Sequence, residues 1–328
     1  MYEVIILEPT LDCNLACPMC DRSMELRKDK ALATFSPDEY IASVRHLFSQ
    51  GREFYISGGE PTIWPGIVEL CVEIINSGAK VVLQTNGTKP EAVRRLVAAG
   101  VTDFNLSIDG PRQVHNSIRG AGTYELMCET VEVISASPKG RFATTIVISD
   151  FNIDSVDRIF SSFRRDRIRP SIMIFELARM FDRDSRCRSA AIVGANLTDV
   201  PVSEAPRRNF KFPIEKLEAQ LKKLQRLAHS YRRRIMFLPD RLTQQTKMFY
   251  DYQSRKGRLV GCKHRGIIRV DSQANVIPCF TFRVPFGNLL LDDWERINQN
   301  SVQFWNSLEG NNLAPVCETC FRLSEIQQ

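Results

Sequence analysis

Short β-branched segments alternate with amphipathic segments through the first half of the chain. Apolar residues at every second position are typical of a strand, and apolar residues three or four apart are typical of a helix. The expected strands are Val4–Leu7, Glu53–Ile56, Lys80–Gln84, Asp103–Ile108, Phe142–Ile148 and Ser171–Phe175. The expected helices are Pro37–Ser49, Ile67–Asn76, Pro90–Ala98, Tyr124–Ala136 and Ile153–Phe163. No hairpin turn joins consecutive strands, so the pattern predicts a parallel sheet with right-handed crossovers.

Six strand–helix units are fewer than the eight of a closed barrel. We therefore expect an α/β fold in the form of an open, partial (β/α)6 barrel. Functional residues of such folds gather at the carboxyl ends of the strands. The 328 residues are enough for this domain and a second, smaller one.

A loop with three closely spaced cysteines follows the first expected strand. Cys13, Cys17 and Cys20 are separated by three and then two residues. Three thiolates suit three irons of a cubane cluster and leave the fourth iron open, as a site that binds a substrate or cofactor requires. Taken alone, the spacing also fits a zinc site or chance.

Polar motifs follow the second, third and fourth expected strands. They are Ser57-Gly58-Gly59-Glu60-Pro61, Thr85-Asn86-Gly87 and Ser107-Ile108-Asp109-Gly110. The paired glycines allow backbone carbonyls to approach a ligand such as an ammonium group. Ribose hydroxyls are the expected partners of four side chains: Thr85, Asn86, Ser107 and Asp109. Arg119, twelve residues after Ser107, is expected to bind a carboxylate through two parallel hydrogen bonds.

Four of the ten cysteines lie near the end of the chain: Cys262, Cys279, Cys317 and Cys320. Four thiolates are what a second, fully ligated cluster requires. The alternative is a zinc knuckle of Cys317 and Cys320 with Cys262 and either Cys279 or His264. A hairpin made by Gly266–Val270 and Val276–Phe280, and a helix near Trp294–Trp305, are expected around them.

Together these motifs resemble the radical S-adenosylmethionine (SAM) superfamily over about residues 1–180. The three-cysteine loop matches its cluster-binding signature. Gly58, Gly59, Glu60 and Pro61 match its motif for the methionine amino group. The stretch from Ser107 to Arg119 resembles the segment that contacts SAM in members with C-terminal cluster domains. Met19 corresponds to a position near the adenine.

The end of the chain resembles the Twitch module, a shortened relative of the SPASM module. The resemblance implies that the four late cysteines hold one auxiliary 4Fe-4S cluster. The extra cysteines of the longer module are absent, and the glycine usual five residues before the second cysteine is Ala274. We therefore expect a radical SAM core at residues 1–235 and a small α+β Twitch/SPASM-like module at residues 236–328.

The resemblance implies a 4Fe-4S cluster that reduces SAM to give a 5′-deoxyadenosyl radical, which abstracts hydrogen from an unactivated carbon. With an auxiliary cluster, net oxidation or redox-neutral epimerisation is expected, so the protein would be a dehydrogenase or an epimerase. Family substrates include peptides, aminocyclitols and sugars, and an external flavodoxin or ferredoxin is the expected electron donor. The alternatives are a tRNA- or cofactor-modifying radical SAM enzyme, or a non-catalytic iron–sulfur or zinc protein.

Composition adds three expectations. The net charge of +6 is mild for 328 residues and argues against a nucleic-acid partner. No apolar run approaches the roughly 18 residues of a membrane span, and the N-terminus does not resemble a signal peptide, so a cytoplasmic protein is expected. The first strand begins at Val4, which leaves no room for an N-terminal peptide-recognition domain.

The segment Asp182–Pro213 has no clear periodicity, which predicts a long loop or lid before a helix at Ile214–Arg234. Within it, Cys187 lies between two arginines, which lower the pKa of a thiol. Redox-neutral epimerases of the family use one thiol to return a hydrogen, so Cys187 is the candidate hydrogen donor. An ordinary loop cysteine is the alternative. His115 is expected to brace the loop before Arg119.

Overall fold

The computed structural model of the chain describes residues 2–20, 35–178, 212–239, 242–244, 246–247, 259–262, 265–279, 283–307 and 323–325. Cys187, Cys317 and Cys320 lie outside these residues, as does nearly all of the expected lid. Within them, no helix is both long enough and apolar enough to cross a membrane.

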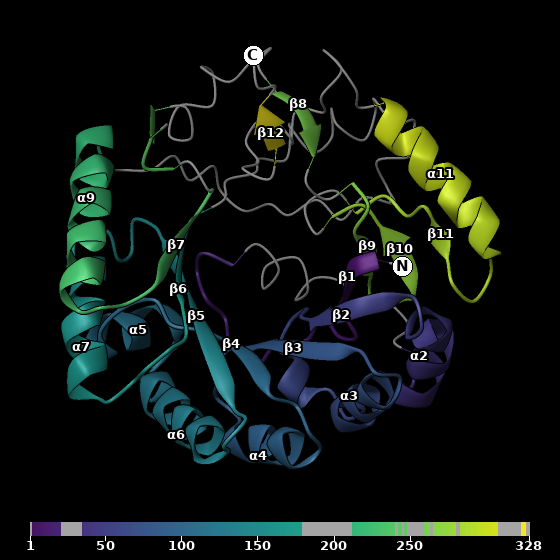
Figure 1. The fold of residues 1–328 in the computed structure, drawn as a ribbon, viewed down its shortest axis with the longest axis horizontal. Coiled ribbons are helices and arrows are strands. Elements are labelled where there is room, and N and C mark those ends of the chain that lie inside the picture. The colour runs from purple at the N-terminus through teal and green to yellow at the C-terminus, as the bar shows by residue number, and fades with distance from the viewer. Residues whose placement is uncertain are drawn as a thin grey trace.

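Seven parallel strands form the inner arc of the molecule (Figure 1). They are β1 (Tyr2–Leu7), β2 (Gly51–Ile56), β3 (Lys80–Thr85), β4 (Asp103–Ser107), β5 (Arg141–Ile148), β6 (Met173–Leu177) and β7 (Ile235–Leu238). Each pairs in parallel with the next in the chain. The predicted α/β fold with a parallel sheet is confirmed. The barrel arc has one more strand than the six expected, β7, because its four residues are too few for a clear alternating pattern.

Helices cover the outer side of this arc (Figure 1). They are α2 (Pro37–Val44), α3 (Ile67–Asn76), α4 (Pro90–Ala98), α5 (Arg112–Arg119), α6 (Thr123–Ala136), α7 (Ile159–Arg165) and α9 (Ile214–Ser230). Strand β2 illustrates why the layers form. Phe54 and Ile56 are buried, whereas Tyr55 between them is only half-buried, because successive strand residues point to opposite faces. The half-buried face is therefore the one that lines the inside of the arc.

Helix α5 replaces the loop that the sequence analysis expected before Arg119. The segment has only Val114 and Ile118 as apolar residues, which is too few for a visible helical period. Its ends nevertheless carry helix signals. Pro111 stands at the N-cap, and Gly120 ends the helix with φ of 117°, a conformation that favours glycine.

The C-terminal segment extends the same sheet at its β1 edge. The added strands are β9 (Ile268–Val270), parallel to β1, then β10 (Asn275–Ile277) and β11 (Gly287–Asn288), each antiparallel to the strand before. This confirms the predicted hairpin. Helix α11 (Trp294–Ser307) contacts β11, and β8 (Leu259–Cys262) pairs with β12 (Leu323–Glu325). The expected domain boundary after residue 235 falls inside β7.

A buried ionic cluster joins the C-terminal strands to β1. Arg269 and Arg283 both donate hydrogen bonds to the Glu8 carboxylate, Arg283 Nη1 at 3.1 Å. Glu8 is fully buried, and both arginines are less than one-tenth exposed. Asp271 Oδ2 lies 3.7 Å from Arg283 Nη2. Because breaking a buried pair leaves an uncompensated charge, this cluster fixes the C-terminal hairpin against the barrel.

Candidate functional site

The cysteine loop, residues Cys13–Cys20, follows β1 at the carboxyl edge of the sheet. The backbone N–H of Cys20 donates to the Cys17 carbonyl at 3.1 Å, which closes a turn. Burial raises the pKa of Cys17 to about 11, Arg119 opposes this shift, and the neighbouring Cys20 and Cys13 sulfurs add to it. The three sulfurs therefore lie close enough to interact, and iron binding would displace a thiol proton.

No group of three His, Cys, Asp or Glu side chains in the described part of the chain is arranged around a single metal ion. A cubane cluster has a different requirement, because each thiolate binds its own iron. Met19 lies half-buried inside the cysteine loop, and its place near the adenine stays a prediction.

Gly58 and Gly59 allow the segment that leads into the cysteine loop to approach the end of β2. A Cβ atom at Gly59 would lie 1.9 Å from the Asp12 carbonyl oxygen, and one at Gly58 would lie 2.2 Å from that of Thr10. Gly58 also has φ of 130°, which other residues rarely adopt. The sequence analysis gave these glycines a different reason, the approach of a ligand ammonium group. That contact stays a prediction.

Glu60 ties the 3-10 helix η2 (Pro61–Ile63) to the end of β3. Its Oε1 accepts hydrogen bonds from Thr62 N at 3.0 Å and Thr85 Oγ1 at 2.7 Å, and its Oε2 accepts one from Asn86 N at 2.7 Å. Burial raises the pKa of Glu60, and these hydrogen bonds partly offset the shift. The protein itself therefore engages both oxygens of Glu60 and the hydroxyl of Thr85.

Arg119 and Asp109 form a buried ion pair beside the cysteine loop. Arg119 Nε donates to Asp109 Oδ2 at 2.6 Å, and Val147 N donates to Asp109 Oδ1 at 3.3 Å. Burial acts to lower the pKa of Arg119, but Asp109 and the Cys17 sulfur raise it further above its usual range. The Asp109 carboxylate thus orients Arg119. The sequence analysis expected a different partner for Asp109, a ribose hydroxyl.

Two groups in this part of the site remain available to a ligand. The terminal amino groups of Arg119 make no hydrogen bond to any described residue, and neither does the hydroxyl of Ser107. A guanidinium held through Nε still presents two parallel N–H groups on its terminal nitrogens, the geometry that binds a carboxylate. The predicted carboxylate contact of Arg119 is therefore compatible with the geometry of the site.

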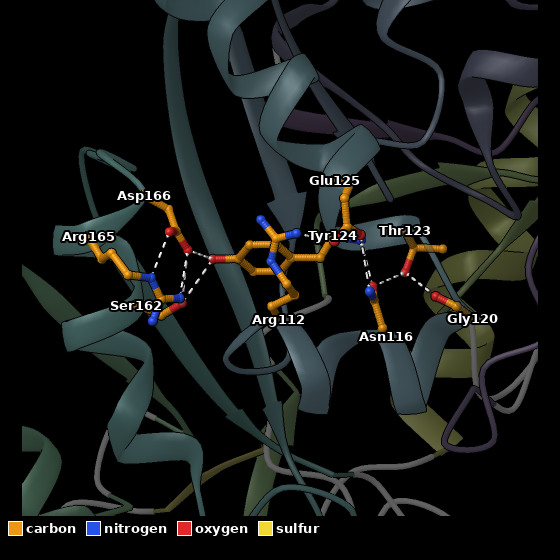
Figure 2. A network of polar contacts seen from close by, with 9 residues as sticks. All are labelled: Arg112, Asn116, Gly120, Thr123, Tyr124, Glu125, Ser162, Arg165 and Asp166. Atoms are coloured by element: carbon orange, nitrogen blue, oxygen red, sulfur yellow. Dashed lines mark hydrogen bonds and ion pairs between the residues drawn. The ribbon is translucent and has the colours of Figure 1, made fainter.

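A polar network joins α5, which carries Arg119, to α6 and α7 (Figure 2). Asn116 Oδ1 accepts from Tyr124 N at 2.8 Å and so caps α6. Asn116 Nδ2 donates to Glu125, which also pairs with Arg112. The Tyr124 hydroxyl donates to Asp166 Oδ2 at 2.8 Å, beyond the end of α7. The network fixes α5 against its neighbours.

The sequence analysis missed a line of hydrogen-bonded side chains on the inner face below the site. Tyr55 Oη donates to Gln84 Oε1 at 2.5 Å and accepts from Asn105 Nδ2 at 2.9 Å, and Thr145 Oγ1 donates to Asn105 Oδ1 at 3.0 Å. Gln84 and Asn105 each stand two positions before a candidate site residue, and Tyr55 stands two positions before the motif that begins at Ser57. The two-residue period of a strand could have identified them.

The C-terminal cysteines are placed only in part. Cys262 ends β8 and Cys279 follows β10, and both are half-buried. Ala274, which replaces the usual glycine, has φ of 60°. Since Cys317 and Cys320 lie outside the described residues, the four-thiolate site stays a prediction.

A protein-family profile and several curated relatives match this sequence. The profile of the Radical SAM superfamily matches residues 7–163. Mycofactocin maturase MftC from Mycobacterium ulcerans (strain Agy99) is 30% identical over 176 residues, which cover 50% of this chain and 47% of the relative. The AdoMet-dependent heme synthase of Methanosarcina barkeri (strain Fusaro / DSM 804) is 33% identical over 163 residues, or 48% of this chain and 46% of the relative. The chain thus spans about half the length of these relatives.

Two solved structures share the fold. Streptococcus suis SuiB bound to precursor peptide SuiA superposes with a TM-score of 0.63 at 12% identity, over 98% of this chain and 72% of SuiB. The structure of anSMEcpe with bound AdoMet and Kp18Cys peptide gives 0.61 at 16% identity, over 93% and 83% of the two chains. Such identities establish the fold alone. Residues 7–163 of this chain, which contain the cysteine loop, belong to the radical SAM superfamily.

Proposed function

We propose that this radical SAM enzyme abstracts hydrogen from an unactivated carbon of a peptide or of a small natural-product precursor such as an aminocyclitol or sugar. The observation that carries the proposal is the position of Arg119. Its charge acts on Cys17 and Cys20, while its terminal amino groups have no hydrogen-bond partner among the described residues. A cationic fork beside a three-thiol loop suits a ligand that carries a carboxylate and approaches an iron.

The residues present fit both cofactors. Cys13, Cys17 and Cys20 would hold a 4Fe-4S cluster, and Arg119 with Ser107 would bind the SAM carboxylate. When bound, the cluster and SAM supply the electron and the 5′-deoxyadenosyl radical. The protein orients SAM through charge-assisted hydrogen bonds, each worth about 1.5–3 kcal/mol.

Support for a peptide substrate comes from the relatives. SuiB shares the fold and is bound to a precursor peptide in its structure, and the sequence relative MftC is named a maturase. A second candidate, modification of a cofactor, is supported by the 33% identity to a heme synthase. Incubation with candidate precursor peptides and with Fe-coproporphyrin, followed by mass spectrometry, would separate the two. A mass change in the porphyrin alone would exclude a peptide as the substrate.

The proposal that the protein is a radical SAM enzyme is tested by anaerobic reconstitution followed by addition of SAM and dithionite. We expect about eight irons per chain, from the cysteine loop and the auxiliary site, and release of 5′-deoxyadenosine. Substitution of Cys13, Cys17 and Cys20 by Ala should leave about four irons and no 5′-deoxyadenosine. Cys128→Ala, on helix α6, is the matched control and should behave as wild type. Undiminished 5′-deoxyadenosine in the triple variant would overturn the assignment.

The outcome of the reaction is proposed to be dehydrogenation or epimerisation. A product with two fewer hydrogens indicates dehydrogenation. A product of unchanged mass in ordinary water that gains one deuterium in deuterated water indicates epimerisation. Cys187→Ala is then informative, because loss of that deuterium with SAM cleavage intact would identify Cys187 as the hydrogen donor. Full activity would exclude this role.

A further inference from the structure

Asn14, Asn86 and Thr88 close a ring of side-chain hydrogen bonds between the cysteine loop and the end of β3. Asn14 Nδ2 donates to Thr88 Oγ1 at 2.8 Å, and Thr88 Oγ1 donates to Asn86 Oδ1 at 2.6 Å. Asn86 Nδ2 donates to Asn14 Oδ1 at 3.1 Å and completes the ring. Asn86 and Thr88 are buried, and within the ring each side chain donates once and accepts once. Hydrogen bonds in such closed chains polarise and strengthen one another.

The backbone fixes the direction of this ring. An amide side chain can be turned over so that its nitrogen and oxygen exchange places. The backbone N–H of Thr88, which can only donate, donates to Asn86 Oδ1 at 2.9 Å. The oxygen of Asn86 must therefore face Thr88, and its nitrogen must face the cysteine loop. There Nδ2 lies 4.0 Å from Cys13 Sγ, which also accepts a hydrogen bond from Leu15 N at 3.4 Å.

We propose that Asn86 donates a hydrogen bond to the Cys13 thiolate and raises the reduction potential of the cluster held by the cysteine loop, with Asn14 and Thr88 as positioning residues. The inference rests on the proposed function. A donor beside a ligating sulfur stabilises the negative charge added on reduction, and hydrogen bonds to the sulfurs are among the factors that set cluster potentials. In this proposal Asn86 acts on the cluster, whereas the sequence analysis expected it to contact a ribose.

The test is a redox titration of the reconstituted protein followed by electron paramagnetic resonance. The signal that changes on addition of SAM identifies the cluster of the cysteine loop. Thr88→Val keeps the shape of the side chain and removes its hydrogen bonds, whereas Thr88→Ser keeps them. At a fixed potential near the wild-type midpoint, we expect Asn86→Ala to lower the ratio of reduced to oxidised cluster about three- to tenfold, the effect of one modest hydrogen bond. Thr88→Val should lower the ratio less, because the backbone N–H of residue 88 still donates to Asn86 Oδ1. Thr88→Ser should match the wild type.

A positioning role predicts a specific pattern in combined variants. Asn86→Ala should lower the potential by more than Thr88→Val does, and the double variant should lower it no further than Asn86→Ala, because Thr88 acts through Asn86. Asn14 is exposed, so Asn14→Ala should leave the fold intact. It should lower the potential in the same direction, because Asn14 also positions Asn86. An unshifted potential in Asn86→Ala or Thr88→Val would overturn the inference, as would iron loss from Thr88→Val alone. Absence of iron from the reconstituted wild type would instead contradict the proposed function.

Discussion

Replacement of Arg119 removes the ion-pair partner of a fully buried carboxylate. Asp109 is 0% exposed, and after Arg119→Ala its carboxylate would keep, among the described residues, the hydrogen bond from Val147 N at 3.3 Å. Breaking a buried pair by removal of one member costs about 3–5 kcal/mol of unfolding free energy. Arg94→Ala is the control, because it breaks an exposed pair with Glu91 that is worth about 0–1 kcal/mol.

Loss of stability and loss of SAM binding can be separated by a double variant. Asp109→Asn with Arg119→Gln leaves no buried charge, so it should recover most of the stability. It should still bind SAM about ten- to hundredfold more weakly, because the charge-assisted contact is gone. Denaturant unfolding of the apo-protein and equilibrium dialysis of SAM give the two quantities. Wild-type SAM affinity in the stable double variant would refute the carboxylate role of Arg119. An unfolding free energy of Arg119→Ala equal to that of the wild type would refute the buried ion pair between Arg119 and Asp109.

Three further predictions concern residues around this pair. Burial lowers the pKa of His115 from 6.5 to about 4. Between these two pH values the unfolded chain binds more protons than the folded one, so the unfolding free energy falls by about 2 kcal/mol when the pH is lowered from 7 to 5. His115→Gln should remove this pH dependence, whereas substitution of the exposed His229 should not, as denaturant unfolding at both pH values will show. Gly59→Ala should abolish iron uptake by the cysteine loop, because its Cβ would meet the Asp12 carbonyl; normal iron content would contradict the loop geometry. Tyr124→Phe should lower the unfolding free energy by about 1–2 kcal/mol through the lost bond to Asp166, and an unchanged value would show that this link in Figure 2 contributes nothing.

The sequence by itself determined the order of the layers and the edge at which the site forms. Period-two segments such as Phe142–Ile148 and period-3.6 segments such as Ile67–Asn76 are local patterns, and the bounds of α3 agree with the expected range. Parallel strands place their carboxyl ends together, so the cysteine loop and Ser107 were expected at one edge without knowledge of any contact.

Only the tertiary structure decided which of these residues contact one another. Thr88 is 74 positions from Asn14, and no local pattern indicates that the two side chains share a hydrogen bond. The same holds for the glycines, since the atoms that exclude a Cβ at Gly59 belong to the loop before Cys13. Periodicity reports which face a side chain occupies. Partners depend on the register and curvature of the whole sheet, which arise when distant segments pack together.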